Sequence, residues 1–170
     1  MANLPVLPSL TQERACGSCS LCCRLLPVPQ LQKDAGRWCP DCRPGAARGG
    51  CGIHETRPDV CRAFNCQWVQ GRGEAGWRPD LSGVLVCGLA DLATGRALVL
   101  YLDRLPLNRA GEWALLYWAT QALALGVALV AYAPLDGLVL RQAAGVAGLA
   151  AEQVDPETWH WETARDGGRV

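Results

Sequence analysis

Cysteine is the residue type whose number and spacing in this chain point to chemistry. The sequence of 170 residues contains ten cysteines, and nine of them fall between Cys16 and Cys66. They form four short groups: Cys16-Gly-Ser-Cys19-Ser-Leu-Cys22-Cys23, Cys39-Pro-Asp-Cys42, Cys51-Gly-Ile-His54 and Cys61-Arg-Ala-Phe-Asn-Cys66. Free cysteine is normally sparse and buried, whereas a short loop with two thiols can direct both toward one metal ion. The spacing therefore predicts a metal site.

The ligand type limits which metals the site could bind but does not identify one. Thiolates select zinc, cuprous copper or iron–sulfur clusters over magnesium or calcium. Because the adjacent Cys22 and Cys23 rarely both reach one tetrahedral ion, we expect two metal centres or a cluster. Two four-thiolate zinc sites, or one iron–sulfur cluster and one zinc, would use Cys16, Cys19, Cys22, Cys23, Cys39, Cys51, Cys61 and Cys66. Cys42 and His54 form a second tier of candidate ligands.

The same stretch resembles a known family. The opening C-x2-C-x2-C-C group, followed by Cys51-Gly-Ile-His54-Glu-Thr-Arg57-Pro58-Asp-Val-Cys61-Arg62-Ala-Phe64-Asn-Cys66, is similar to the YkgJ-type CxxCxxCC cysteine-cluster family of zinc- or iron-chelating proteins. The resemblance covers residues 16–66 and implies a chelated zinc or iron centre. His54 stands where that family has Tyr, which favours a packed or hydrogen-bonding ring over ligation, and Ser20 stands where it has Gly.

Composition favours a globular chain without a charged partner surface. Half of the residues are hydrophobic, and the length suits either one domain or one domain with an appended module. Basic and acidic residues number 16 each, so no net field attracts nucleic acid or acidic lipid. The first eight residues lack the basic start and apolar run of a secretory signal. We therefore expect a cytoplasmic protein, in which thiols stay reduced.

We expect three parts along the chain. Residues 1–15 read as an irregular lead-in. Residues 16–70 read as a cysteine-cluster metal-binding module, because prolines and glycines interrupt every regular pattern there. Metal ligation would supply the missing order, since a structural zinc contributes on the order of 10 kcal/mol to folding. After a linker at Gly71–Gly76, residues 77–170 read as an α+β scaffold or docking half.

This second half has a ββαββ pattern, which makes the fold class α+β. The predicted elements are strands at 82–91 and 97–103 joined by a hairpin, a helix at 109–125, strands at 127–132 and 138–141, and a short helix starting near Asp155. The predicted buried stripe of the long helix is Leu115, Leu116, Ala119, Ala122 and Leu123. No charged residue occurs from Trp113 to Leu135, a length that could cross a membrane. Gly126 and the strand-like run after it favour a buried helix instead, so we expect no membrane contact.

The leading functional hypothesis is a metal-binding protein that chelates zinc or an iron–sulfur centre, with the metal ion and a docking protein as partners. One alternative is a redox enzyme or electron carrier that uses the cluster or the Cys39/Cys42 dithiol; another is a metal chaperone or sensor. No Walker loop, G-x-S-x-G or H-E-x-x-H motif competes. We expect Cys87 to be a small core residue and His160 a surface or packing residue. Arg57 and Arg62 either offset thiolate charge or are solvated.

Overall fold

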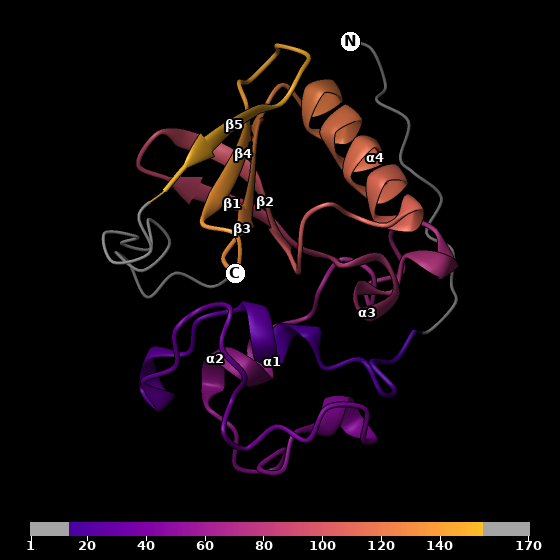
Figure 1. Ribbon diagram of the computed structural model, residues 1–170, viewed down its shortest axis with the longest axis vertical. Coiled ribbons are helices and arrows are strands. Elements are labelled where there is room, and N and C mark those ends of the chain that lie inside the picture. The colour runs from indigo at the N-terminus through magenta and orange to yellow at the C-terminus, as the bar shows by residue number, and fades with distance from the viewer. Residues whose placement is uncertain (1–13, 155–170) are drawn as a thin grey trace, which may run out of the picture.

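A computed structural model describes residues 14–154 of the chain. Its four α-helices and five strands form a mixed α+β structure. The helices are α1 (Leu21–Leu25), α2 (Asp59–Ala63), α3 (Pro79–Ser82) and α4 (Arg109–Leu125); the strands are β1 (Val84–Leu92), β2 (Gly95–Leu102), β3 (Ala128–Ala133), β4 (Leu138–Gln142) and β5 (Ala150–Gln153). Figure 1 shows the cysteine-rich loops with α1 and α2 on one side of the sheet and of α4. The predicted α+β class is confirmed, whereas metal stabilisation of the cysteine-rich part stays a prediction. The predicted helix near Asp155 and His160 lie outside the described residues.

The five strands form one sheet in the order β1-β2-β3-β4-β5. Neighbours pair antiparallel except β2 and β3, which are parallel and are connected through α4. Two residues, Ala93 and Thr94, close the tight hairpin between β1 and β2. The ββαββ order is thus confirmed, and β5 adds an edge strand that the sequence did not predict.

Helix α4 has the predicted bounds. It begins after Asn108, whose side-chain oxygen accepts a hydrogen bond from the Gly111 amide, and it ends at Gly126 in the left-handed region. Its buried residues are mostly small: Gly111, Ala114, Trp118, Ala119 and Ala122. The predicted stripe is therefore wrong for Leu116, which is 56% exposed, and for Leu123, which is 36% exposed.

Small residues decide which face of α4 is buried. The helix approaches α3 so closely that a Cβ atom at Gly111 would lie 2.2 Å from the carbonyl oxygen of Ser82. A larger side chain on this face would hold the helix away from the sheet. Of the helices described, none is long and apolar enough to span a membrane.

Two clusters of buried side chains lie on opposite faces of the sheet, because successive residues of a strand point to opposite faces. Leu98, Leu100 and Leu102 of β2 pack in the cluster that contains the buried face of α4. Val99 and Tyr101 pack in the other cluster. This second cluster, here called the lower cluster, consists of Cys19, Leu21, Leu25, Cys66, Leu85, Cys87, Leu92, Ala97, Val99, Tyr101, Val130, Tyr132 and Val139.

The lower cluster joins the cysteine-rich half to the sheet. Leu21 and Leu25 of α1 pack in it beside residues of β1, β2, β3 and β4. An ion pair also crosses between the halves, with 2.8 Å between Arg24 Nη1 and Asp103 Oδ1. Within the segment predicted as a linker, the carbonyls of Glu74 and Ala75 accept hydrogen bonds from the Trp68 indole at 3.2 Å. The division near Gly71–Gly76 stays a prediction, but apolar packing crosses it.

Candidate metal centre

Helix α1 positions the opening cysteine group. The Cys19 amide donates to the Cys16 carbonyl at 2.8 Å, and the Cys23 amide donates to the Ser20 carbonyl at 3.0 Å, so the chain turns tightly before and into the helix. Leu21 and Leu25, four residues apart, lie on the buried side of α1. The apolar side of the helix is thereby anchored, while Cys22 and Cys23 stay half-buried.

Backbone hydrogen bonds bring the second and third groups against the first. The Cys39 amide donates to the Cys23 carbonyl at 2.9 Å, and the Gly49 amide donates to the Gly17 carbonyl at 2.9 Å. Cys42 and Cys51 face each other in an antiparallel β-bridge. Gly50 has φ +70°, and a Cβ atom there would lie 2.2 Å from the Arg43 carbonyl oxygen, so only glycine fits this close approach.

The fourth group is held by its own turn and by an arginine. The Cys61 amide donates to the Pro58 carbonyl at 2.9 Å, at the start of α2. The Arg62 side chain donates to the carbonyls of Glu55 at 2.8 Å and Arg57 at 3.0 Å. Arg62 thus closes the loop that leads into Cys61.

The thiols of the four groups lie close enough to influence one another. Cys23 interacts electrostatically with Cys39, Cys42 and Cys61, and Cys51 interacts with Cys39 and Cys61. We call this set the Cys23 group; its members are Cys22, Cys23, Cys39, Cys42, Cys51 and Cys61. Cys16 interacts with both Cys23 and Cys66, and Cys66 interacts with Cys19. The structure therefore gathers all eight first-tier cysteines and Cys42 on one side of the sheet.

The gathered thiols are not yet arranged as ligands. All ten cysteines are free thiols. In the described part of the chain, no three Cys, His, Asp or Glu side chains stand in a geometry that would hold a metal ion. Coordination would require the thiol side chains to turn toward a common point.

Burial favours the protonated form of several of these thiols. It raises the pKa of Cys19 to about 11 and that of Cys42 to about 12, and it also raises the pKa of Cys39. A hydrogen bond with Cys22, together with burial, raises the pKa of Cys23 well above its ordinary value. Because the thiolate is the attacking form, we expect the Cys39/Cys42 dithiol to react only slowly.

Lys33, the single lysine in the sequence, is the charged residue that sequence reasoning missed. Its side chain is 5% exposed, and its Nζ donates to the carbonyls of Arg24 at 3.2 Å and Asp34 at 3.1 Å and also to that of Leu26. Burial lowers its pKa, while four thiols act in the opposite direction: Cys39, Cys23, Cys22 and Cys61. The feature of the sequence that could have indicated its role is that the only lysine of the chain lies among the cysteine motifs.

Arg57 is a second cation near the thiols. Its charge acts to lower the pKa of both Cys16 and Cys61, against the larger effect of burial. Its Nε atom is buried and has no hydrogen-bond partner among residues 14–154. Of the two readings drawn from the sequence, a cation beside the thiols fits Arg57 better than a solvated side chain.

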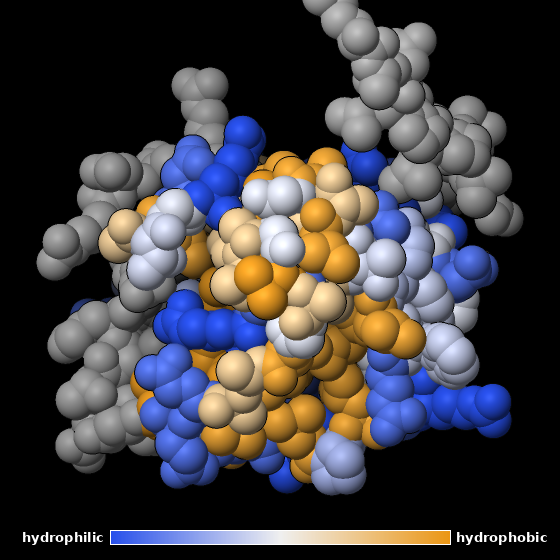
Figure 2. All heavy atoms as spheres, turned by 90° about the horizontal axis from the view of Figure 1, so that it is seen from above, coloured by the Kyte–Doolittle hydropathy of each residue, from blue (hydrophilic) through white to orange (hydrophobic). Residues whose placement is uncertain are grey.

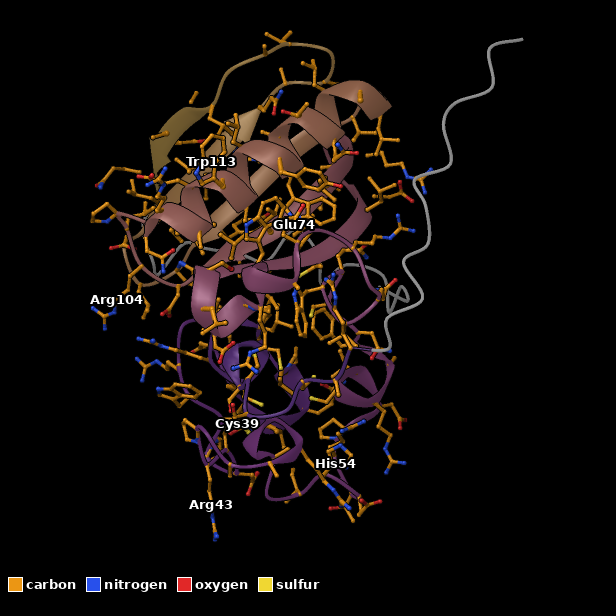
Figure 3. The ribbon with its side chains drawn as sticks, turned by 90° about the vertical axis from the view of Figure 1, so that its right-hand side faces the viewer. Cys39, Arg43, His54, Glu74, Arg104 and Trp113 are labelled. Atoms are coloured by element: carbon orange, nitrogen blue, oxygen red, sulfur yellow. The ribbon has the colours of Figure 1, made fainter. Side chains whose placement is uncertain are left out.

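His54, a second-tier candidate ligand, lies close to the carboxylate of the adjacent Glu55. Its Nδ1 is 3.4 Å from Glu55 Oε1. In Figure 3, Cys39 and His54 both lie in the cysteine-rich half, and the Arg43 side chain extends away from it. The contact of His54 agrees with a hydrogen-bonding ring.

Cys87, predicted as a small core residue, is buried in the lower cluster.

No family model, curated protein or solved structure matches the chain. The resemblance of residues 16–66 to the YkgJ-type family therefore stays a prediction. What the chain does has to be inferred from the thiols and the charged groups around them.

Proposed function

We propose that the protein binds a thiophilic metal, as zinc or an iron–sulfur centre, through the cysteines of residues 16–66. One observation carries the proposal: Cys23 interacts with thiols from the second and fourth cysteine groups, and Cys51 of the third group interacts with the same thiols. Groups separated by many residues in the sequence thus converge on one region. Thiols fit soft metals by their chemistry.

The convergence suggests how ligands are divided. The Cys23 group can offer one thiol from each of the four sequence groups, for example Cys23, Cys39, Cys51 and Cys61, which is the number that a tetrahedral zinc takes. Cys16, Cys19 and Cys66 would then serve a second centre or extend the first into a cluster. When bound, the metal would favour thiolates over thiols and cross-link the loops. Because no three donor side chains of residues 14–154 stand in ligand geometry, binding would include rotation of the thiol side chains.

The two cations suit this role. A zinc ion with four thiolates carries a net charge of about −2. Lys33 and Arg57 bring two positive charges beside the thiols, from different loops. Their field would offset the charge of the loaded site, as the surroundings of metal–thiolate centres commonly do. The high thiol pKa values, in turn, give the Cys39/Cys42 dithiol hypothesis less support.

Elemental analysis of anaerobically purified variants tests the proposal. We expect Cys61→Ser and Cys22→Ser each to remove most of the bound metal, because both residues belong to the Cys23 group. Cys87→Ser is the matched control and should keep full metal content, because Cys87 lies in β1 outside the cysteine motifs. A brown protein would identify iron–sulfur, and a colourless protein with zinc would identify a zinc site. Full metal in both the Cys61 and Cys22 variants would overturn the proposal.

A further inference from the structure

A groove outside the Cys23 group contains a cysteine that the proposed function does not use. The groove has a volume of about 620 Å³ and runs between residues 63–70 and the middle of β1. Phe64, Asn65 and Gln67 line one side, and Cys87 and Leu89 line the other. Cys87 is otherwise buried, so the groove is the route by which a small molecule could reach its sulfur.

Gln67 fixes the backbone of Cys66 next to that of Cys87. Its amide donates to the Val86 carbonyl at 2.9 Å, and its side chain donates to the Cys87 carbonyl at 3.4 Å. The Cα of Cys66 lies about 2.4 Å from the bonded nitrogen, and the Cα of Cys87 lies about 2.8 Å from the bonded oxygen. The two Cα atoms are therefore at most about 8 Å apart, and any bend at the hydrogen bond brings them nearer to the disulfide range of about 4.4–6.8 Å.

The two side chains lie on the same face of the sheet. Cys66 and Cys87 both belong to the lower cluster, and the charge of Cys66 acts on Cys87. The pairing of β1 with β2 shifts between Val86 and Gly88, which makes Cys87 the extra residue of a β-bulge. Because Cys87 has no opposite residue on β2, its backbone can adjust without breaking the ladder.

We propose that Cys66 and Cys87 are an oxidisable thiol pair that reacts with a peroxide entering the groove and closes to a disulfide. The Cys87 sulfur attacks one peroxide oxygen, the O–O bond breaks, and the products are a sulfenic acid and water. The Cys66 sulfur then displaces the hydroxyl group from Cys87, which leaves as a second water with the remaining thiol proton. Two thiols lose two electrons in total, and one hydrogen peroxide is reduced to two waters.

The disulfide would tie residue 66 covalently to the sheet. The reaction needs no metal, so the pairing can be tested whether or not the proposed metal site is correct. Competition between this disulfide and a metal for Cys66 is a further consequence that rests on the proposed function. The pKa of both thiols is raised by burial, so we expect slow oxidation.

Peptide mapping of the full, chelator-treated chain can test this directly. Trypsin does not cut the Arg78–Pro79 bond, so Cys66 and Cys87 each fall in a peptide with no other cysteine, residues 63–72 and 73–96. The protein is incubated with hydrogen peroxide, quenched with an alkylating reagent in acid and digested. We expect peptide 63–72 linked to peptide 73–96 as the main disulfide of Cys87. The link should be at least several-fold less abundant when oxidation is carried out in urea.

Two controls keep the outcome clear. In Cys87→Ala the linked peptide pair disappears, whereas in Leu89→Ala, which changes the groove wall but keeps both thiols, the pair still forms. If Cys66 is oxidised while Cys87 is still recovered as a free thiol in its alkylated form, the proposal is overturned. A link between peptide 63–72 and residues 15–24 would also overturn it, because a cysteine of the opening group would then be the partner of Cys66. Neither outcome bears on metal content, which the serine variants measure separately.

Discussion

Replacing Leu25 by alanine asks whether the cysteine-rich half and the sheet share one core. Leu25 has no exposed surface and lies in α1, two residues after Cys23, yet it packs in the lower cluster with residues of the sheet. Removing a fully buried leucine side chain costs about 2–5 kcal/mol. A domain of this size has about 5–15 kcal/mol of stability in total. The loss is therefore large enough to measure by urea unfolding.

The assay that separates the possibilities is hydrogen exchange on chelator-treated protein. If the lower cluster couples the halves, Leu25→Ala should lower the protection of the Tyr101 and Tyr132 amides by the same free energy that it removes from α1. Leu81→Ala is the matched control: Leu81 is 52% exposed and should change stability by less than about 0.5 kcal/mol. Unchanged protection in β2 and β3, with protection lost only in α1, would refute the shared core. It would instead support the boundary predicted near Gly71–Gly76.

Two further predictions concern the sheet and α4. Burial raises the pKa of Tyr101 well above its ordinary value; its contribution to stability is therefore present below about pH 10 and is lost as pH rises toward the folded-state pKa, by about 1.4 kcal/mol per pH unit. Tyr101→Phe should flatten this alkaline loss in urea titrations, and equal slopes in the variant and the parent protein would contradict the assignment. Gly111→Ala should destabilise the protein by about 1–3 kcal/mol because its Cβ would meet the Ser82 carbonyl, whereas Gly76→Ala, with open space around it, should cost little. Equal thermal midpoints for these two variants would show that α4 can move away from α3.

The sequence was informative where local signals agreed with the fold. The Asn108 cap and Gly126 mark both ends of α4, and the apolar runs mark four strands. The buried face of α4 could not be predicted, because leucines and alanines occur all around the helix and the buried side depends on close packing, such as that of Gly111 against the Ser82 carbonyl. Strand β5 could not be predicted because all four of its residues are exposed, and its place depends on pairing with β4.

For the site, spacing predicted which thiols would converge but not what surrounds them. The cysteine groups meet through backbone hydrogen bonds such as that from Cys39 to Cys23, which no local pattern encodes. Lys33 is separated from the nearest cysteine, Cys39, by five residues, and only the folded loops bring it among four thiols. Cys87 looked like an ordinary core residue because its proximity to Cys66 arises from contact between distant segments.

The burial of Lys33 has a practical consequence for chemical probing. Because it is the only lysine in the sequence and is 5% exposed, residues 14–154 present no freely accessible side-chain amine to an acylating reagent. Its Nζ is held by three backbone carbonyls from residues 24–34. Acylation of Lys33 would therefore require that this loop open first. The rate at which this single side-chain amine is acylated, followed by mass spectrometry, would therefore report how often the loop beside the thiols opens.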